Sequence, residues 1–323
     1  MPKAITVKSC KHIYGNEVDS TATKSGGDFW EGLVNMCAKA AQDALDTPPA
    51  GYTPTQRNSL TDVFTSMRAT HKGIRALVKL GDTKPESVDS LTLARLQLEG
   101  LYNLCLLTEG PQHVDRFVRD AFKRQYARYL LYREETQHLS KFDDYNATDL
   151  SRLNMMMQIW GITENQRRTI EYHELEITPP AGFKIERIDP FPTPGQLITD
   201  IPAGTKRRML ERLYPEYQEL CVYAHGRAAA GFGKGIFDDR SPVRSFLGEV
   251  KVHEMFQQQV LAATQVYSLL SMAQSAAELT VLYPHDIELA RVVALAWNEL
   301  HTANIVTTAV WSIRTKTMLG IVG

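Results

Sequence analysis

The sequence predicts an all-α protein, and three observations lead to that fold class. Apolar residues recur at the three- and four-residue spacing of amphipathic helices over most of the 323 residues. Alternation of apolar and polar residues, the pattern of a half-buried strand, is confined to short segments. The last two periodic stretches are separated only by Tyr283-Pro284-His285, a link short enough for an antiparallel helical hairpin. We therefore expect a bundle of about nine or ten helices.

The N-terminal third is expected to hold an arm followed by three helices. Residues 1–25 are polar, and only residues 4–9 alternate weakly, so we take this segment as an N-terminal arm. Asp28 is the expected N-cap of the first helix, and Pro48 and Pro49 follow its end. Helices are expected over residues 29–45, 54–80 and 91–107.

The middle of the chain predicts four more helices around a segment rich in proline. Pro111 occupies the favoured first-turn position of the first of them. Six prolines between residues 177 and 204 exclude a long helix there, and residues 183–188 alternate like one isolated strand. We expect residues 26–323 to form a single domain, in two layers divided near 177–204. The four helices are expected over residues 111–139, 147–160, 164–176 and 205–224.

The C-terminal third predicts a glycine-rich loop and then the long hairpin, over residues 244–282 and 286–319. The loop, 226–235, lacks the GxxxxGK[ST] spacing of a phosphate-binding loop, and no strand precedes it, so we expect no nucleotide there. The apolar face of the hairpin is expected to include Phe256, Val260, Leu269, Val293, Trp297 and Ile305.

Composition places few constraints on function. The hydrophobic fraction of 43% is typical of a globular protein. The formal net charge of -1 gives no global attraction to nucleic acid or to an anionic membrane. The four cysteines stand far apart, without the spacing of a zinc site, and fit free thiols in the cytoplasm. No apolar stretch is long enough to span a membrane, so we expect no membrane association. We expect neither a cofactor nor a metal.

Two charged residues stand in the apolar stretch 91–107. Arg95 and Glu99 are one helical turn apart, at the i,i+4 spacing that lets their side chains meet. Their neighbours are apolar on nearly every side, which is typical of a helix inside a protein. The apolar neighbours lead us to expect that this pair is largely buried. Because a buried charge needs a partner, the two residues should form either an internal ion pair that holds helices together or the floor of a pocket.

A second group of polar residues lies near the end of the expected helix 205–224. Tyr217, Cys221 and His225 are spaced by four and share one helical stripe, and Gly226 follows. A histidine hydrogen-bonded at a helix C-terminus would account for this stripe without any further function.

These two segments together resemble a widespread family of uncharacterised, all-helical, mainly bacterial proteins known as a domain of unknown function. The family shows an Arg–Leu–Glu helix and, later, a Tyr, a Leu-Ser pair and a His-Gly pair; here Cys221 stands where Ser is usual. The resemblance covers about residues 60–226. It implies a helical bundle in which Arg95, Glu99, Tyr217 and His225 lie close together. Some relatives are similar to HEPN-like proteins of bacterial defence systems, including defence against phage.

Catalytic candidates follow from the HEPN-like comparison, because such ribonucleases carry an Arg and a His that act on one phosphate. Arg133 and His138 have the expected spacing on one helix, whereas Arg95 and His225 need two helices to converge. The basic and aromatic residues of 111–139 would also suit RNA, although acidic residues dilute their charge. A carboxylate-bound metal enzyme is a third alternative, carried only by single pairs of Glu and His.

We therefore expect a cytoplasmic helical binding protein without catalysis of its own, in a bacterial defence system, with a protein partner or a second copy of the chain. Its expected binding pocket is Arg95, Glu99, Tyr217, Cys221 and His225. The alternative is a metal-independent HEPN-like ribonuclease with catalytic candidates among His225, Arg95, Arg133 and His138.

Overall fold

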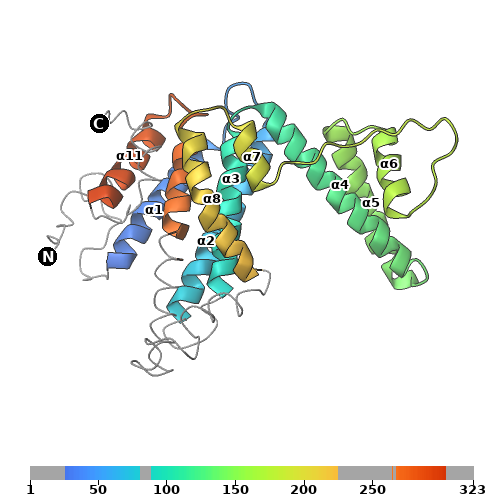
Figure 1. Ribbon diagram of the computed structural model, residues 1–323, viewed down its shortest axis with the longest axis horizontal. Helices are drawn as coiled ribbons and strands as arrows, with labels where there is room; N and C mark the ends of the chain where they lie inside the picture. The colour runs from blue at the N-terminus through green and yellow to red at the C-terminus, as the bar shows by residue number, and fades with distance from the viewer. Residues whose placement is uncertain (1–25, 81–88, 225–263, 265–266, 303–323) are drawn as a thin grey trace.

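The computed structural model describes residues 26–80, 89–224, 264 and 267–302, and this part of the chain is built from helices (Figure 1). The prediction of an all-α fold is confirmed. No strand occurs among these residues: segment 183–188 is extended but pairs with no other segment, so the strand expected there is wrong. Ile185 of this segment is 55% exposed, whereas Ile188 is buried in a small hydrophobic core. Within the same ranges, no helix is long and apolar enough to cross a membrane.

Up to residue 224, the bounds of the expected helices fall within four residues of those predicted from periodicity, except that Asp28 lies inside the first helix and not at its cap. The expected start of the next helix, 244, and the expected end of the last, 319, lie outside the described residues. A short helix also starts at Pro194, inside the proline-rich segment. The elements are α1 (Gly26–Ala44), α2 (Pro54–Leu80), α3 (Asp89–Leu107), α4 (Pro111–Thr136), the 3₁₀ turn η4 (Ser140–Phe142), α5 (Asp143–Ile159), α6 (Glu164–Glu174), α7 (Pro194–Asp200), α8 (Thr205–Ala224) and α11 (Ile287–Thr302).

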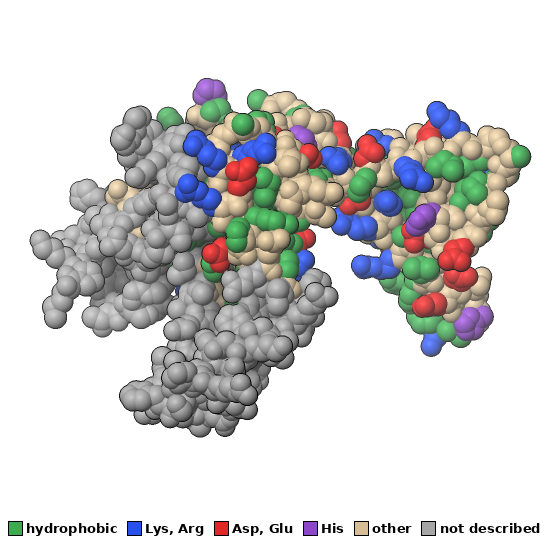
Figure 2. Space-filling model, in the orientation of Figure 1, with side chains coloured by type: hydrophobic (Ala, Val, Ile, Leu, Met, Phe, Trp, Pro, Cys, Tyr) green, Lys and Arg blue, Asp and Glu red, His purple; other side chains and the backbone are tan. Residues whose placement is uncertain are grey.

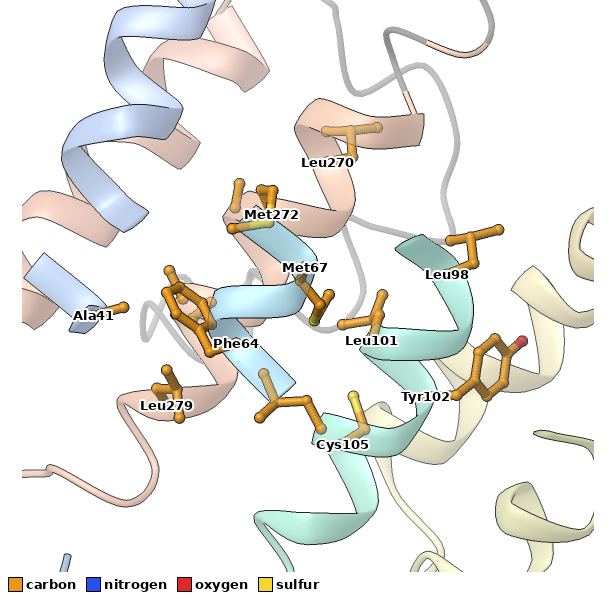
Figure 3. Packing of buried hydrophobic residues seen from close by; sticks show 14 of the residues in the cluster. Ala41, Phe64, Met67, Leu98, Leu101, Tyr102, Cys105, Leu270, Met272 and Leu279 are labelled. Carbon is orange, nitrogen blue, oxygen red and sulfur yellow. The ribbon is translucent and has the colours of Figure 1, made fainter. Parts of the chain in front are cut away.

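The main bundle is organised around a further helix, residues 267–279, which we call the central helix. Every residue from 268 to 279 is buried. In the same bundle, α2 packs along α3, α3 along α8, and α1 along α11. Figure 3 shows Met67 of α2 and Leu101 of α3 beside Leu270 and Met272 of the central helix. A helix covered on all sides is the expected centre of a helical domain.

A separate lobe extends from the bundle and consists of α4, α5 and α6 (Figure 1). The first half of α4 contributes Val114 to the main core, whereas its second half contributes Phe122, Tyr126 and Leu130 to a second, smaller core. The chain then returns to the bundle along segment 177–193. Arg116 Nε, on α4, donates a hydrogen bond to the Pro190 carbonyl at 2.9 Å and so fastens this return segment.

Part of the expected C-terminal hairpin lies outside the described residues. Leu269, Val293 and Trp297 are buried as expected. Phe256, Val260 and Ile305 fall outside, as does the glycine-rich loop 226–235. The antiparallel hairpin over 244–319 therefore stays a prediction.

The central helix carries a buried polar stripe, although apolar residues surround it. Four of its members are spaced by three and four residues in turn, so they share one face: Ser268, Ser271, Ser275 and Glu278; Thr264, four residues before Ser268, is buried as well. At the far end of the stripe, the buried Lys206 of α8 forms an ion pair with Glu278 at 3.3 Å. Its ammonium group also contacts the Glu109 carboxylate and donates to Thr108 Oγ1 at 3.0 Å. This cluster ties α3, α8 and the central helix together.

We predict that Lys206→Met lowers the free energy of unfolding by about 3–5 kcal/mol, because the buried Glu278 carboxylate loses its ammonium partner. Urea denaturation checks this. The double variant Lys206→Met, Glu278→Leu should recover most of the loss, since both charges are then gone. A single variant as stable as the parent chain would contradict the prediction.

Candidate functional site

The packing of α3 against α8 brings together four of the five residues of the expected pocket. Arg95 Nη2 lies 3.2 Å from Glu99 Oε2, and Arg95 Nε lies 3.2 Å from Cys221 Sγ. The guanidinium carbon is 5.8 Å from the centre of the Tyr217 ring, within the range of a cation–π contact. His225 lies outside the described residues. We call these four residues the Arg95 cluster.

Arg95 and Glu99 are bonded to each other, and Arg95 to α8, as expected, but they are half-buried and not fully enclosed. Their side chains are 22% and 35% exposed. The physical reason is the placement of α3, whose apolar residues do not all face the core: Leu96, beside Arg95, is 45% exposed. The pair therefore lies at the edge of the α3–α8 interface, where water screens its charges.

Aromatic side chains support the inner side of the Arg95 cluster. The Tyr217 ring stacks on Tyr214 at 6.2 Å and lies 5.7 Å from the ring of Tyr102. Burial raises the pKa of Tyr217 to about 12, so the phenol is neutral at physiological pH. Burial alone would lower the pKa of Arg95, but hydrogen bonding to Tyr217 and Cys221 raises it on balance. The guanidinium is thus a fixed cation held by groups of its own chain.

The second catalytic candidate pair lies at the far end of α4. Arg133 is in the last turn of that helix, is exposed, and has its guanidinium carbon 5.7 Å from the Tyr129 ring centre. The helix ends at Thr136, so His138 lies beyond it and not on it as expected. His138 is also exposed. The pair has none of the burial that tunes a catalytic histidine.

The single Glu–His pairs of the metal alternative are Glu135 with His138 and Glu249 with His253. Neither gains support from the described part of the chain, where no group of three or more His, Cys, Asp or Glu residues could hold a metal ion. Glu249 and His253 lie outside it.

The structure also contains a buried polar row that sequence reasoning missed. Ser268 Oγ of the central helix lies 2.6 Å from Nδ1 of His71 on α2. His71 Nε2 lies 3.1 Å from both carboxylate oxygens of Glu31 on α1. Arg75 Nη1 holds the same carboxylate at 3.0 Å. The row therefore connects three helices.

Serine, histidine and a carboxylate in one hydrogen-bonded row have the composition of a hydrolase triad. Access argues against that chemistry, because Ser268 is 1% exposed and sits within a helix, whose backbone N–H groups are occupied. We assign the row a structural role. A signal was present in the sequence: Leu60, Phe64, Met67, His71 and Ile74 follow one helical stripe, in which only His71 is polar.

Comparison with known proteins adds no relative, since no family model, no curated protein and no solved structure matches the chain. Function must therefore be argued from the geometry.

We predict that Arg95→Ala lowers the free energy of unfolding by about 1 kcal/mol, because the ion pair is partly screened by water while the guanidinium also packs on Tyr217. Arg207→Ala is the matched control: it breaks another i,i+4 pair, with Glu211, whose carboxylate is 45% exposed. The control should change stability by less than half as much. A loss above 3 kcal/mol for Arg95→Ala would restore the interpretation as a buried charge.

A second prediction concerns Glu31. Burial would raise the pKa of its carboxyl group, but the hydrogen bond and charge of His71, with Arg75, lower it below the ordinary 4.5. A lowered pKa stabilises the fold above 4.5, and this contribution is lost as the pH falls through the folded-state pKa. Glu31→Gln should therefore cost about 1–3 kcal/mol at pH 7 and progressively less below pH 4.5. Denaturant unfolding across pH, with the exposed Glu135→Gln as control, tests this; a pH-independent deficit would contradict it.

Proposed function

We propose that the protein is a helical interaction protein and that the α4–α6 lobe supplies its contact surface. One observation carries this proposal. Of the ten large hydrophobic side chains exposed in the described part of the chain, seven belong to the lobe and its return segment. They are Leu131, Leu139, Tyr145, Met155, Ile159, Ile177 and Ile185.

The lobe is built to present such a surface. It has a hydrophobic core of its own, which includes Tyr126, Leu130 and Leu153, so its helices are held in place without a partner. Figure 2 shows hydrophobic side chains on the face of the lobe turned to the viewer. Large exposed apolar side chains gathered on one element are typical of protein–protein contact sites.

The outer side of α5 gives this surface a helical pattern. Tyr145, Met155 and Ile159 are 58%, 59% and 52% exposed. Positions 145, 148, 152, 155 and 159 alternate steps of three and four residues, so these three side chains follow one stripe. A stripe of this kind is the face that a helix offers to another helix. Either another protein or a second copy of this chain would fit it.

The Arg95 cluster supports an interaction protein more than an enzyme. Its guanidinium is engaged by Glu99, Cys221 and Tyr217, so it is turned toward its own chain and away from any phosphate. The ribonuclease alternative would gain support from RNA cleavage in EDTA that is lost in His138→Ala or His225→Ala. A cytoplasmic location and a role in bacterial defence stay proposals that depend on the family resemblance.

The proposal predicts that lobe positions, and not exposed bundle positions, contact a partner in cells. A photo-crosslinking amino acid placed at Ile185 should yield a species of higher mass, and Met155→Glu with Ile159→Glu should abolish it, because charges would enter the apolar contact. The control is the same crosslinker at Val281, which is 48% exposed on the bundle. Denaturing gels and mass spectrometry read the products. Equal yields at both positions, or no effect of the double substitution, would contradict a role for the lobe.

A further inference from the structure

The register between α3 and the central helix is fixed at both ends. Near the start of α3, Ser90 Oγ lies 3.3 Å from Thr264 Oγ1. Near its end, Lys206 Nζ lies 3.3 Å both from the Cys105 carbonyl and from Glu278 Oε2. The paired positions are thus 90 with 264 and 105 with 278. The two helices therefore run in the same direction, because a step of 15 residues along α3 accompanies a step of 14 residues along the other chain segment.

This register places two buried polar residues, one on each helix, at the same height along the two helix axes. We call this height the Gln97 level. Gln97 lies seven residues, or two helical turns, after Ser90, and Ser271 lies seven residues after Thr264. Both side chains are fully buried, at 0% exposure. Among the described residues, no group forms a hydrogen bond with Gln97 Nε2, Gln97 Oε1 or Ser271 Oγ. Three buried polar atoms without a partner in this part of the chain thus lie between the same two helices.

Helix α2 closes the third side of this level. On one side of it, Met67 is wedged between the two helices: a Cβ on Gly100 would lie 2.6 Å from Met67 Cγ, and Ser275 Oγ is 3.6 Å from Met67 Sδ (Figure 3). On the other side, His71 of α2 bonds to Ser268. Three helices therefore enclose the polar atoms of Gln97 and Ser271. Above and below them, Met67 and His71 are engaged with Ser275 and Ser268.

Physical chemistry points to what satisfies these atoms. A buried amide is rarely left without hydrogen bonds, and buried polar sites hold ordered water where apolar ones stay dry. The Gln97 oxygen accepts and its nitrogen donates two hydrogens; one water molecule can serve the oxygen and the nearer N–H, but the second N–H points away from the oxygen and needs another partner. We propose that two ordered water molecules bind here, one donating to Gln97 Oε1, the other accepting from Gln97 Nε2, with the Ser271 hydroxyl bonded to one of them. This internal site goes beyond the proposed interaction function and is independent of it.

The direct test is a crystal structure of the full chain at a resolution that shows solvent. We expect two solvent peaks, one about 2.7–3.2 Å from Gln97 Oε1 and one at the same distance from Gln97 Nε2. A map with no solvent peak in that range, or with a single peak, would overturn the proposal.

A second test uses the sign of a stability change. If water satisfies the amide, Gln97→Leu removes good hydrogen bonds and lowers the melting midpoint by about 2–4 °C. If the amide is unsatisfied, the same variant removes a penalty and raises the midpoint.

Ser271→Ala should lower the melting midpoint as well. The double variant with Gln97→Leu should lose less than the sum of the two single losses, because both groups share one water molecule. The matched control is Ser275→Ala with Gln97→Leu, for which additive losses are expected, since Ser275 bonds to the Ser271 carbonyl. A raised midpoint for Gln97→Leu, or additive losses with Ser271→Ala, would overturn the proposal.

Discussion

The central helix has no side that faces solvent, so its polar groups must find their partners inside the protein. Thr264 meets Ser90 of α3, Ser268 meets His71 of α2, and Glu278 meets Lys206 of α8. Apolar packing is non-directional and tolerates sliding, whereas these pairs each fix one position along a helix axis. The polar stripe thus sets the register in which the bundle closes, and it places the Arg95 cluster at the edge of the α3–α8 interface.

One long helix, α4, connects the lobe to the main bundle. The start of α4 is held in the main core, and its second half leaves that core and builds another with α5 and α6. Because the helix is continuous, the lobe is carried at a fixed angle. A rigid element that presents apolar side chains away from the main core suits recognition better than catalysis, and this contrast underlies the function we propose.

Sequence periodicity predicted the helices well, because amphipathic spacing is a local property: the bounds of α2 and α8 agree to the residue. Burial was harder to predict. The apolar surroundings of Arg95 suggested the interior, but Leu96 is a leucine in solvent, which a pattern alone cannot distinguish from a core leucine. The Glu31–His71–Ser268 row was missed because its members are about 40 and about 200 residues apart, and long-range pairing leaves no local signal beyond one histidine in an apolar stripe.

A core that contains so many hydroxyl, amide and carboxylate groups has a thermodynamic consequence. Exposure of apolar surface raises the heat capacity on unfolding, and exposure of polar surface lowers it. The polar stripe of the central helix therefore reduces the heat-capacity change for the amount of core that melts. A smaller change flattens the curve of stability against temperature, so the bundle should resist cold as well as moderate heat better than an all-aliphatic bundle of equal maximum stability.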